Sequence, residues 1–174
     1  MRMLSLLYRF TEINNLTALS TFYKYFVSPK IEYCSQIWSM ACPSNSDRLN
    51  SILNFFLAIV RHRIPSTKHL QKSILLQMLN IQTPQERHRL ADHIFLHKIV
   101  NGNIRSDHLL QEIHFCVPAR STRSTLLFAS QKPRLCLIQR SLFHRLPSEY
   151  NNLGSQIDIF KNLDRLRRKL TKSM

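Results

Sequence analysis

Glycine is nearly absent from this chain of 174 residues, which contains only Gly102 and Gly154. Loops that cradle phosphates, dinucleotide-binding fingerprints and tight two-residue hairpins all need backbone positions that glycine fills most easily. Long apolar runs are missing too. No segment approaches the ~20 residues of a membrane-spanning helix, and Arg9 interrupts the apolar start before a signal-peptide core could form. We therefore expect an intracellular protein, nuclear or cytoplasmic, and neither a nucleotide-binding enzyme nor a membrane protein.

Acidic residues are also scarce, since 10 Asp and Glu stand against 25 Lys and Arg, which gives a formal charge of +15 with neutral histidines. The surplus is concentrated: residues 48–85 hold five basic residues and no acid, and residues 113–148 hold six and no acid. A field of one sign attracts polyanions over long range, so nucleic acid is the first partner to consider. The alternative is that the charge only keeps an apolar chain soluble.

Cysteine patterns that would indicate a disulfide framework or a structural zinc site are missing. The chain has four cysteines, with no C-x-x-C pair and no zinc-ribbon spacing. We therefore expect them to be small buried hydrophobic residues. They are Cys34, Cys42, Cys116 and Cys136.

Two histidines, His93 and His97, lie four residues apart on a predicted helix, a spacing that suits two metal ligands on one face. The glutamate of an H-E-x-x-H site is missing, because Ile94 follows His93. We interpret both histidines as partly buried among apolar neighbours, and we predict no metal and no cofactor. A metal-dependent enzyme that uses this pair is the alternative.

Helical periodicity dominates what the sequence does contain. Apolar residues from Asp47 to His62 follow i, i+3, i+4, i+7 spacing, with Ser46 available as N-cap. The segment TPQE, residues 83–86, has the pattern of a capping box with proline at the first helical position. Gly102 suits the left-handed end of the same helix, which is therefore predicted to reach about Asn101.

The same periodicity predicts shorter helices over residues 4–10, 16–27, 29–38, 70–79, 106–113, 135–146 and 156–170. The segment VPARSTRST, residues 117–125, lacks periodicity and is rich in Ser, Thr and Arg, so we expect an extended basic loop over 117–134. No alternation is long enough to predict a sheet. The predicted fold class is all-α: an irregular multi-helix bundle of short to medium helices with one basic extended loop.

Aromatic and aliphatic residues gather around one proline in TFYKYFVSPKIEYCSQIW, residues 21–38. This run resembles the segment that follows the catalytic palm in reverse transcriptases of non-LTR (LINE) retrotransposons of the jockey type. Tyr25 departs from the pattern, since serine usually follows the lysine there. The resemblance continues in register through LNSILNFFLAIVRHRI, LQMLNIQTPQERHRLADHIFLHKIVNG and VPARSTRST, and so covers almost the whole chain. The matching positions in the first run are Phe22, Tyr23, Lys24, Pro29, Glu32, Tyr33, Ser35 and Trp38.

The resemblance implies part of an RNA-directed DNA polymerase from a transposable element, without its catalytic palm. Two-metal phosphoryl transfer in that family uses palm carboxylates, one of them in an Asp-Asp turn, and this sequence has no adjacent Asp-Asp pair. Residues 1–63 resemble the thumb and residues 64–174 the helical region after it, with the basic loop 117–134 and a basic C-terminal helix. We therefore predict no catalytic residue and no enzymatic activity for this chain alone.

The resemblance also implies that the chain binds template-primer or another nucleic acid through backbone phosphates, with the palm of a reverse transcriptase as a further partner. Whether RNA or DNA is preferred stays open. Around Pro29 the resemblance places Tyr23, Phe26, Ile31 and Trp38 in the core at a joint between two helices, and leaves Lys24 and Lys30 on the phosphate side.

Further candidate phosphate ligands come from three other segments. Arg61 and Arg63 close a helix, where the macrodipole favours cations whatever their function. Arg120 and Arg123 lie in the basic loop, and the arginine fork suits phosphate or sugar contacts. The last helix carries a basic stripe at i, i+4, i+7, i+11 spacing, for which a merely solvated face is the alternative. The stripe consists of Lys161, Arg165, Arg168 and Lys172.

A different class of function is a helical protein-interaction module, or a retroelement remnant without function. Detached from its palm, the thumb-like region is expected to expose an apolar patch around Tyr8, Phe10 and Phe22, and such patches self-associate.

Overall fold

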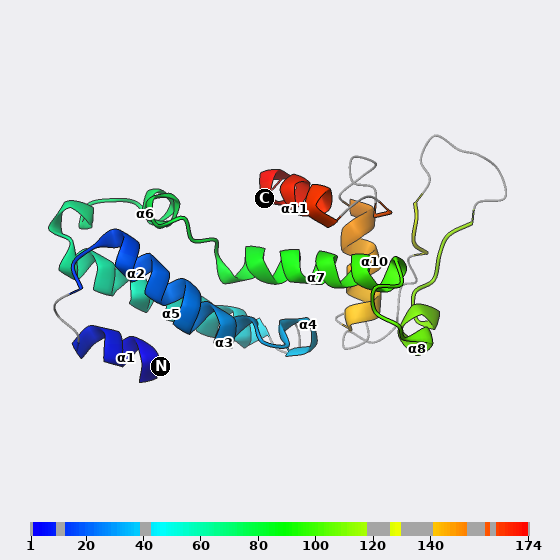
Figure 1. The fold of residues 1–174 in the computed structure, drawn as a ribbon, viewed down its shortest axis with the longest axis horizontal. Coiled ribbons are helices and arrows are strands. Elements are labelled where there is room, and N and C mark those ends of the chain that lie inside the picture. Colours follow the sequence, from blue (N-terminus) through cyan, green and yellow to red (C-terminus); the bar gives the residue numbers. More distant parts are fainter. Residues whose placement is uncertain are drawn as a thin grey trace. The chain divides into compact units, whose positions relative to one another are not determined.

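The computed structural model describes residues 2–9, 13–38, 43–117, 126–129, 141–152, 159–160 and 163–173. These residues form helices joined by turns and short irregular segments (Figure 1). Within the described ranges no β-strand forms, and an isolated antiparallel bridge pairs Phe115 with Phe128. The predicted all-α class is therefore confirmed, whereas most of the expected basic loop lies outside the described residues.

The chain divides into two compact units, Met1–His88 (unit 1) and Arg89–Met174 (unit 2). Each unit has its own hydrophobic core. The division falls inside α7 (Pro84–Val100), so this helix supplies its first turn to unit 1 and the rest to unit 2. The division into residues 1–63 and 64–174 that the sequence suggested stays a prediction.

Unit 1 is built on one long helix, α5 (Pro43–Arg63), which contributes Leu53, Phe56 and Leu57 to the core. The ring of Tyr23 lies 4.5 Å from that of Phe56, and this contact joins α5 to the helix around Pro29. The remaining elements of the unit are α1 (Arg2–Arg9), α2 (Leu16–Phe22), a π-helix (Tyr23–Val27), α3 (Ser28–Glu32), α4 (Ser35–Trp38), a 3-10 turn (Pro65–Thr67) and α6 (Lys72–Leu79).

Pro29 lies inside a continuous helical rod that runs from Leu16 to Glu32, so the break predicted at this proline is wrong (Figure 1). A proline ring clashes with the carbonyl four residues earlier in an α-helix, and proline has no N–H to donate. The preceding turn is widened into the π-helix, in which the Ser28 N–H donates to the Tyr23 carbonyl. The rod ends at Glu32, three residues after Pro29, and Cys34 two residues further on has a left-handed φ of 52°.

The start of α5 also differs from the prediction, because the helix begins at Pro43 and Ser46 lies within it. Proline is favoured in the first turn of a helix, where its missing N–H has no intrahelical partner. The Ser46 hydroxyl instead accepts a hydrogen bond of 3.0 Å from Gln85 Nε2 at the start of α7. This side chain therefore helps to fix α7 against α5 and does not cap α5.

The predicted boundaries of α7 are confirmed. Glu86 Oε2 accepts from the Thr83 N–H at 2.8 Å, and Thr83 Oγ1 accepts from the Glu86 N–H at 3.4 Å, which completes the capping box. At the other end Gly102 has a φ of 69°, in the left-handed region that glycine adopts without steric cost.

Unit 2 surrounds the second part of α7 with α8 (Asp107–Gln111), α10 (Leu142–Asn152) and α11 (Leu163–Ser173). The helix predicted over 135–146 is α10, which continues through Pro147, a buried residue inside the helix. The helix predicted over 156–170 begins later, because Ile159 and Phe160 form a turn. The core consists of Leu96, Ile99, Ile113, Phe128, Leu146, Tyr150, Ile159, Leu166 and Leu170.

Two of the four cysteines contradict the expectation that they are buried. Cys34 is exposed at the end of the rod 16–32, and Cys116 is exposed beside the bridge of Phe115. Both lie where the backbone leaves regular structure, and the hydrophobic cores are filled by larger side chains. Cys42 and Cys136 lie outside the described residues.

Candidate nucleic-acid interface

The described surface of unit 1 is asymmetric in charge, because two of the three acids described in this unit are engaged internally. Glu32 pairs with Arg87, and Glu86 closes the capping box of α7. Asp47 is the one fully exposed acid among the residues of this unit that the structure describes. Several cations of this unit are exposed and form no ion pair with a residue in the described ranges. They are Arg9, Lys30, Arg48 and Lys68.

The two predicted lysines lie on the helical rod 16–32, where Lys30 is exposed and Lys24 is half-buried. Glu32 is the only acid in this rod. It is held by a two-pronged contact with Arg87, in which Nε donates to Oε1 and Nη2 donates to Oε2 at 2.7 Å. The charge of this carboxylate is thereby balanced within the unit, so the exposed side of the rod keeps a positive sign.

Tyr23 sits beside this ion pair and is buried, with 1% of its surface exposed. Burial raises the pKa of its phenol to about 12, and the nearby negative charge of Glu32 adds to the effect. The phenol is therefore neutral at physiological pH, and its role is packing against Phe56.

Arg61 and Arg63, which the sequence suggested as phosphate ligands, already bind backbone carbonyls. Arg61 Nη2 donates to the Leu70 carbonyl at 3.2 Å. Arg63 Nη1 donates to the Ile13 carbonyl at 3.1 Å, and its Nη2 donates to the Leu7 carbonyl in the last turn of α1. These contacts tie α1 and the segment after α5 to α5 itself, so we leave both arginines out of the proposed interface.

Of the candidates in unit 2, the structure places only Arg168, whose side chain is exposed on α11. The backbone positions of Arg165 and Lys172 lie on the same helix. Arg120, Arg123 and Lys161 lie outside the described residues. The predicted basic stripe and the loop arginines therefore stay predictions.

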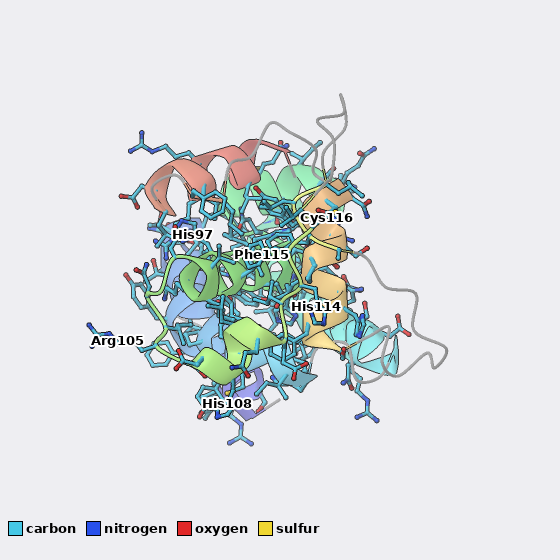
Figure 2. All side chains as sticks on the ribbon, turned by 90° about the vertical axis from the view of Figure 1, so that its right-hand side faces the viewer. His97, Arg105, His108, His114, Phe115 and Cys116 are labelled. Carbon is cyan, nitrogen blue, oxygen red and sulfur yellow. The ribbon has the colours of Figure 1, made fainter. Side chains whose placement is uncertain are left out.

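The residues just before the predicted loop are paired with the described segment 126–129 inside it. The Cys116 N–H donates to the Leu127 carbonyl and the Ala129 N–H donates to the His114 carbonyl, both at 2.9 Å. The Asn151 side chain of α10 brackets the backbone of Phe128, donating to its carbonyl at 2.8 Å and accepting from its N–H at 3.3 Å. Figure 2 shows His114, Phe115 and Cys116 in succession along this stem, and Arg105 before α8 pointing away from the ribbon.

Exposed aromatic side chains on the rod 16–32 and just after it were missed by the sequence reasoning. Tyr25 is 74% exposed, Phe26 51% and Tyr33 77%. The expectation that Phe26 belongs to the core is therefore wrong, while the burial of Tyr23 and Ile31 is confirmed and Trp38 packs partly buried against the same core. The replacement of serine by Tyr25 was the one signal in the sequence that this face is unusually aromatic.

Unit 2 contains a buried charged cluster between α7 and α10. Asp92 Oδ2 lies 2.9 Å from Arg145 Nη1, with the two side chains 0% and 8% exposed. The alignment is poor for a hydrogen bond, and Asp92 and Arg145 have none to a residue within the described ranges. Burial raises the pKa of Asp92 to about 6, against the opposing attraction of Arg145 and with a further rise from Glu149.

The two histidines of the metal hypothesis are more deeply buried than expected, at 4% exposure each. Burial lowers the pKa of His93 to about 4, and the positive charges of Arg145 and Arg89 lower it further. Within the described part of the chain, no group of three or more His, Cys, Asp or Glu side chains is placed to hold a metal ion. His93 thus belongs to the charged cluster, as a neutral imidazole.

None of the described helices combines the length and apolar character needed to cross a membrane. No protein-family model, no curated protein and no solved structure matches this chain. The resemblance to the reverse-transcriptase segment therefore stays a prediction from the sequence.

Proposed function

We propose that this chain is the helical, palm-less part of a LINE-type reverse transcriptase, and that it binds nucleic acid through backbone phosphates. The observation that carries the proposal is the charge asymmetry in the described part of unit 1, where Glu32 and Glu86 are engaged internally and Asp47 is the one exposed acid. The exposed cations opposite this single acid include Arg9, Lys30, Arg48 and Lys68. Phosphate contacts of this kind position a protein on a nucleic acid without reading its sequence.

The contacts assigned to unit 1 are Lys30 and, at its half-buried position, Lys24. Both lie on the rod 16–32, whose only acid is balanced by Arg87. Lysine acts as a point charge, so these residues favour any polyanion and do not select one base sequence. Arg168 of α11 and the candidates outside the described residues would add contacts in unit 2. The proposal assigns no catalytic residue to this chain.

A salt titration of binding to a duplex tests this function. We expect a dissociation constant on the order of 10⁻⁴ to 10⁻⁶ M at physiological salt, and a log-log salt slope of about −0.9 for each phosphate neutralised. Lys30→Gln should make that slope shallower by about 0.9. Lys68→Gln is the matched control, because it removes one exposed lysine of the same unit that was not assigned to the interface.

Binding that does not change between about 50 and 200 mM salt would contradict the proposal, as would the absence of binding at the lowest salt. Equal effects of Lys30→Gln and Lys68→Gln would show that only net charge matters and would remove the rod from the interface. Circular dichroism of each variant confirms that the helices are retained.

The exposed apolar side chains favour a second candidate function, a protein-interaction module. Tyr8 is 57% exposed and Ile37 78%, and Phe22 is half-buried, while Phe10 lies outside the described residues. Light scattering of the purified chain separates the two functions. Under the proposed function the chain scatters as a monomer, whereas a concentration-dependent rise in mass would favour the interaction module.

A further inference from the structure

The rod 16–32 carries exposed aromatic rings beside an exposed cation, and this combination has a specific chemical meaning. We define the aromatic face as Tyr25 and Phe26 of the π-helix and Tyr33 at the end of the rod, with Lys30 between them along the chain. All four residues are exposed. Large exposed aromatic side chains mark binding surfaces when they cluster, because single ones are common but groups are not.

The ring of Phe26 packs against the ring of a neighbouring residue on the rod. Its ring stacks on that of half-buried Phe22, with centroids 5.0 Å apart and planes 29° from parallel. This contact restrains the ring while 51% of the Phe26 side chain stays exposed, and a restrained ring loses less side-chain entropy when a partner binds. The π-helix that accommodates Pro29 contains both Tyr25 and Phe26, and π turns are frequent at functional sites.

The charge around the face selects the class of partner. No exposed acid lies between residues 16 and 38, because Glu32 is the only acid there and Arg87 neutralises it. An acidic polymer with flat apolar groups matches rings and lysine together, and unpaired nucleotides supply both, since each base has a π-face and each linkage a phosphate. A duplex hides its base faces within the stack, so it satisfies the lysine but not the rings.

We infer that the aromatic face binds single-stranded nucleic acid by stacking unpaired bases on Tyr25, Phe26 and Tyr33 while Lys30 contacts the strand's phosphates. This inference rests on the proposed function, which it deepens by naming the form of nucleic acid. The spacing of the aromatic residues along the chain agrees with this inference. Tyr33, just after the rod, is eight positions beyond Tyr25, which at about 1.5 Å per residue corresponds to a rise of about 12 Å. That length corresponds to three or four stacked nucleotides at ~3.4 Å each.

The test compares two labelled probes of about 16 nucleotides in fluorescence anisotropy, oligothymidylate and an abasic strand with the same number of phosphates. The full chain should bind oligothymidylate about tenfold more tightly than the abasic strand, because only the former offers bases to stack. In the Tyr25→Leu/Phe26→Leu double variant this ratio should fall to about one while the abasic affinity is unchanged. Leucine keeps apolar volume but has no ring.

Phe55→Leu is the matched control, since Phe55 is an exposed aromatic residue of α5 outside the aromatic face. It should keep the wild-type ratio. If the double variant loses its helices in circular dichroism, Tyr33→Leu replaces it, because that side chain is 77% exposed at the end of the rod. Tyr33→Leu should lower the affinity for oligothymidylate alone.

The outcomes separate this inference from the proposed function. Equal wild-type affinity for both probes overturns the stacking inference and leaves phosphate binding intact. Binding of oligothymidylate without binding of the abasic strand overturns phosphate binding as the main source of affinity and supports stacking. If the leucine variants change self-association in sedimentation and leave the probe ratio unchanged, the face is a protein contact and the inference is wrong.

Discussion

In each unit the structure describes an arginine–carboxylate pair to which α7 contributes one partner. In unit 1, Arg87 of α7 meets Glu32, with side chains 37% and 25% exposed. In unit 2, Asp92 of α7 meets Arg145 with 0% and 8% exposed. Both pairs join an arginine to a carboxylate, and they differ in their exposure to solvent. The first pair is partly exposed and makes two hydrogen bonds, whereas the second is buried and makes one poorly aligned contact.

The pKa of Asp92 shows which effect dominates in the buried pair. Its rise to about 6 means that lost hydration outweighs the attraction of an arginine only 2.9 Å away. A buried ion pair of this kind contributes little net stability, yet removing one partner leaves an uncompensated charge in the interior. An arginine–carboxylate pair is therefore a modest surface contact in unit 1 and a strong constraint in unit 2.

Breaking the buried pair should give the largest effect. Arg145→Met leaves Asp92 without its partner, and we expect unit 2 to lose about 3–5 kcal/mol of unfolding free energy. Trp38 is the only tryptophan, so its fluorescence follows unit 1 alone, while far-UV circular dichroism follows both units. The variant should shift the circular dichroism transition and leave the Trp38 transition in place.

The control is the double variant Asp92→Leu/Arg145→Met, which removes both charges. It should recover most of the lost stability, because well-packed apolar residues often replace a buried ion pair without cost. If the double variant is as unstable as the single one, packing around α10 and not the unpaired charge causes the loss.

The second largest effect is on the pH dependence of unit 2. Asp92 has a pKa raised from 3.8 to about 6, so the stability it contributes is complete below about 3.8 and is lost as the pH rises through 6. His93 has a pKa lowered from 6.5 to about 4, so its contribution is complete above about 6.5 and is lost as the pH falls through 4. Between about pH 4 and 6.5, the stability contributed by Asp92 therefore falls with rising pH while that contributed by His93 rises.

Wild-type unit 2 should therefore show a nearly flat profile between about pH 4 and 6.5. His93→Gln isolates the aspartate, which faces Arg145 and Glu149, and the unfolding free energy should then fall by about 2 kcal/mol as the pH rises from 4 to 6. Denaturant unfolding followed by hydrogen exchange of α10 measures this. A flat profile in His93→Gln would refute the assignment of the opposing trend to Asp92.

Local signals in the sequence predicted the parts of the fold that depend on neighbouring residues. The capping box of Thr83 and Glu86 and the left-handed Gly102 bound α7 as expected, because their hydrogen bonds span three or four residues. The prediction of a helix break at Pro29 also used only neighbouring residues, and it was wrong. Proline inside a helix kinks or breaks it unless the backbone adjusts, and here the preceding turn widens into a π-helix, an outcome that packing of Tyr23 and Val27 in the core supports.

The candidate site was predicted less well because side-chain partners come from distant segments. Nothing in the sequence around Arg63 shows that its fork binds the carbonyls of Leu7 and Ile13. The exposure of Phe26 was not predicted either, since the resemblance placed this apolar residue in the core, whereas it lies exposed in the π-helix.

The smallest effect concerns the exposed pair of unit 1. Glu32→Gln keeps the size of the side chain and removes its charge, and we expect a loss of about 1 kcal/mol or less, because water solvates a half-exposed arginine. Trp38 lies on this junction, with its ring edge-on to His88 at 5.4 Å, so its fluorescence reports the change. Arg48→Gln, an exposed arginine of α5, is the control and should stay within about 0.5 kcal/mol of wild type. A loss as large as that of Arg145→Met would show that solvent exposure does not distinguish the two pairs, and it would make the Glu32–Arg87 contact the feature that fixes α7 to unit 1.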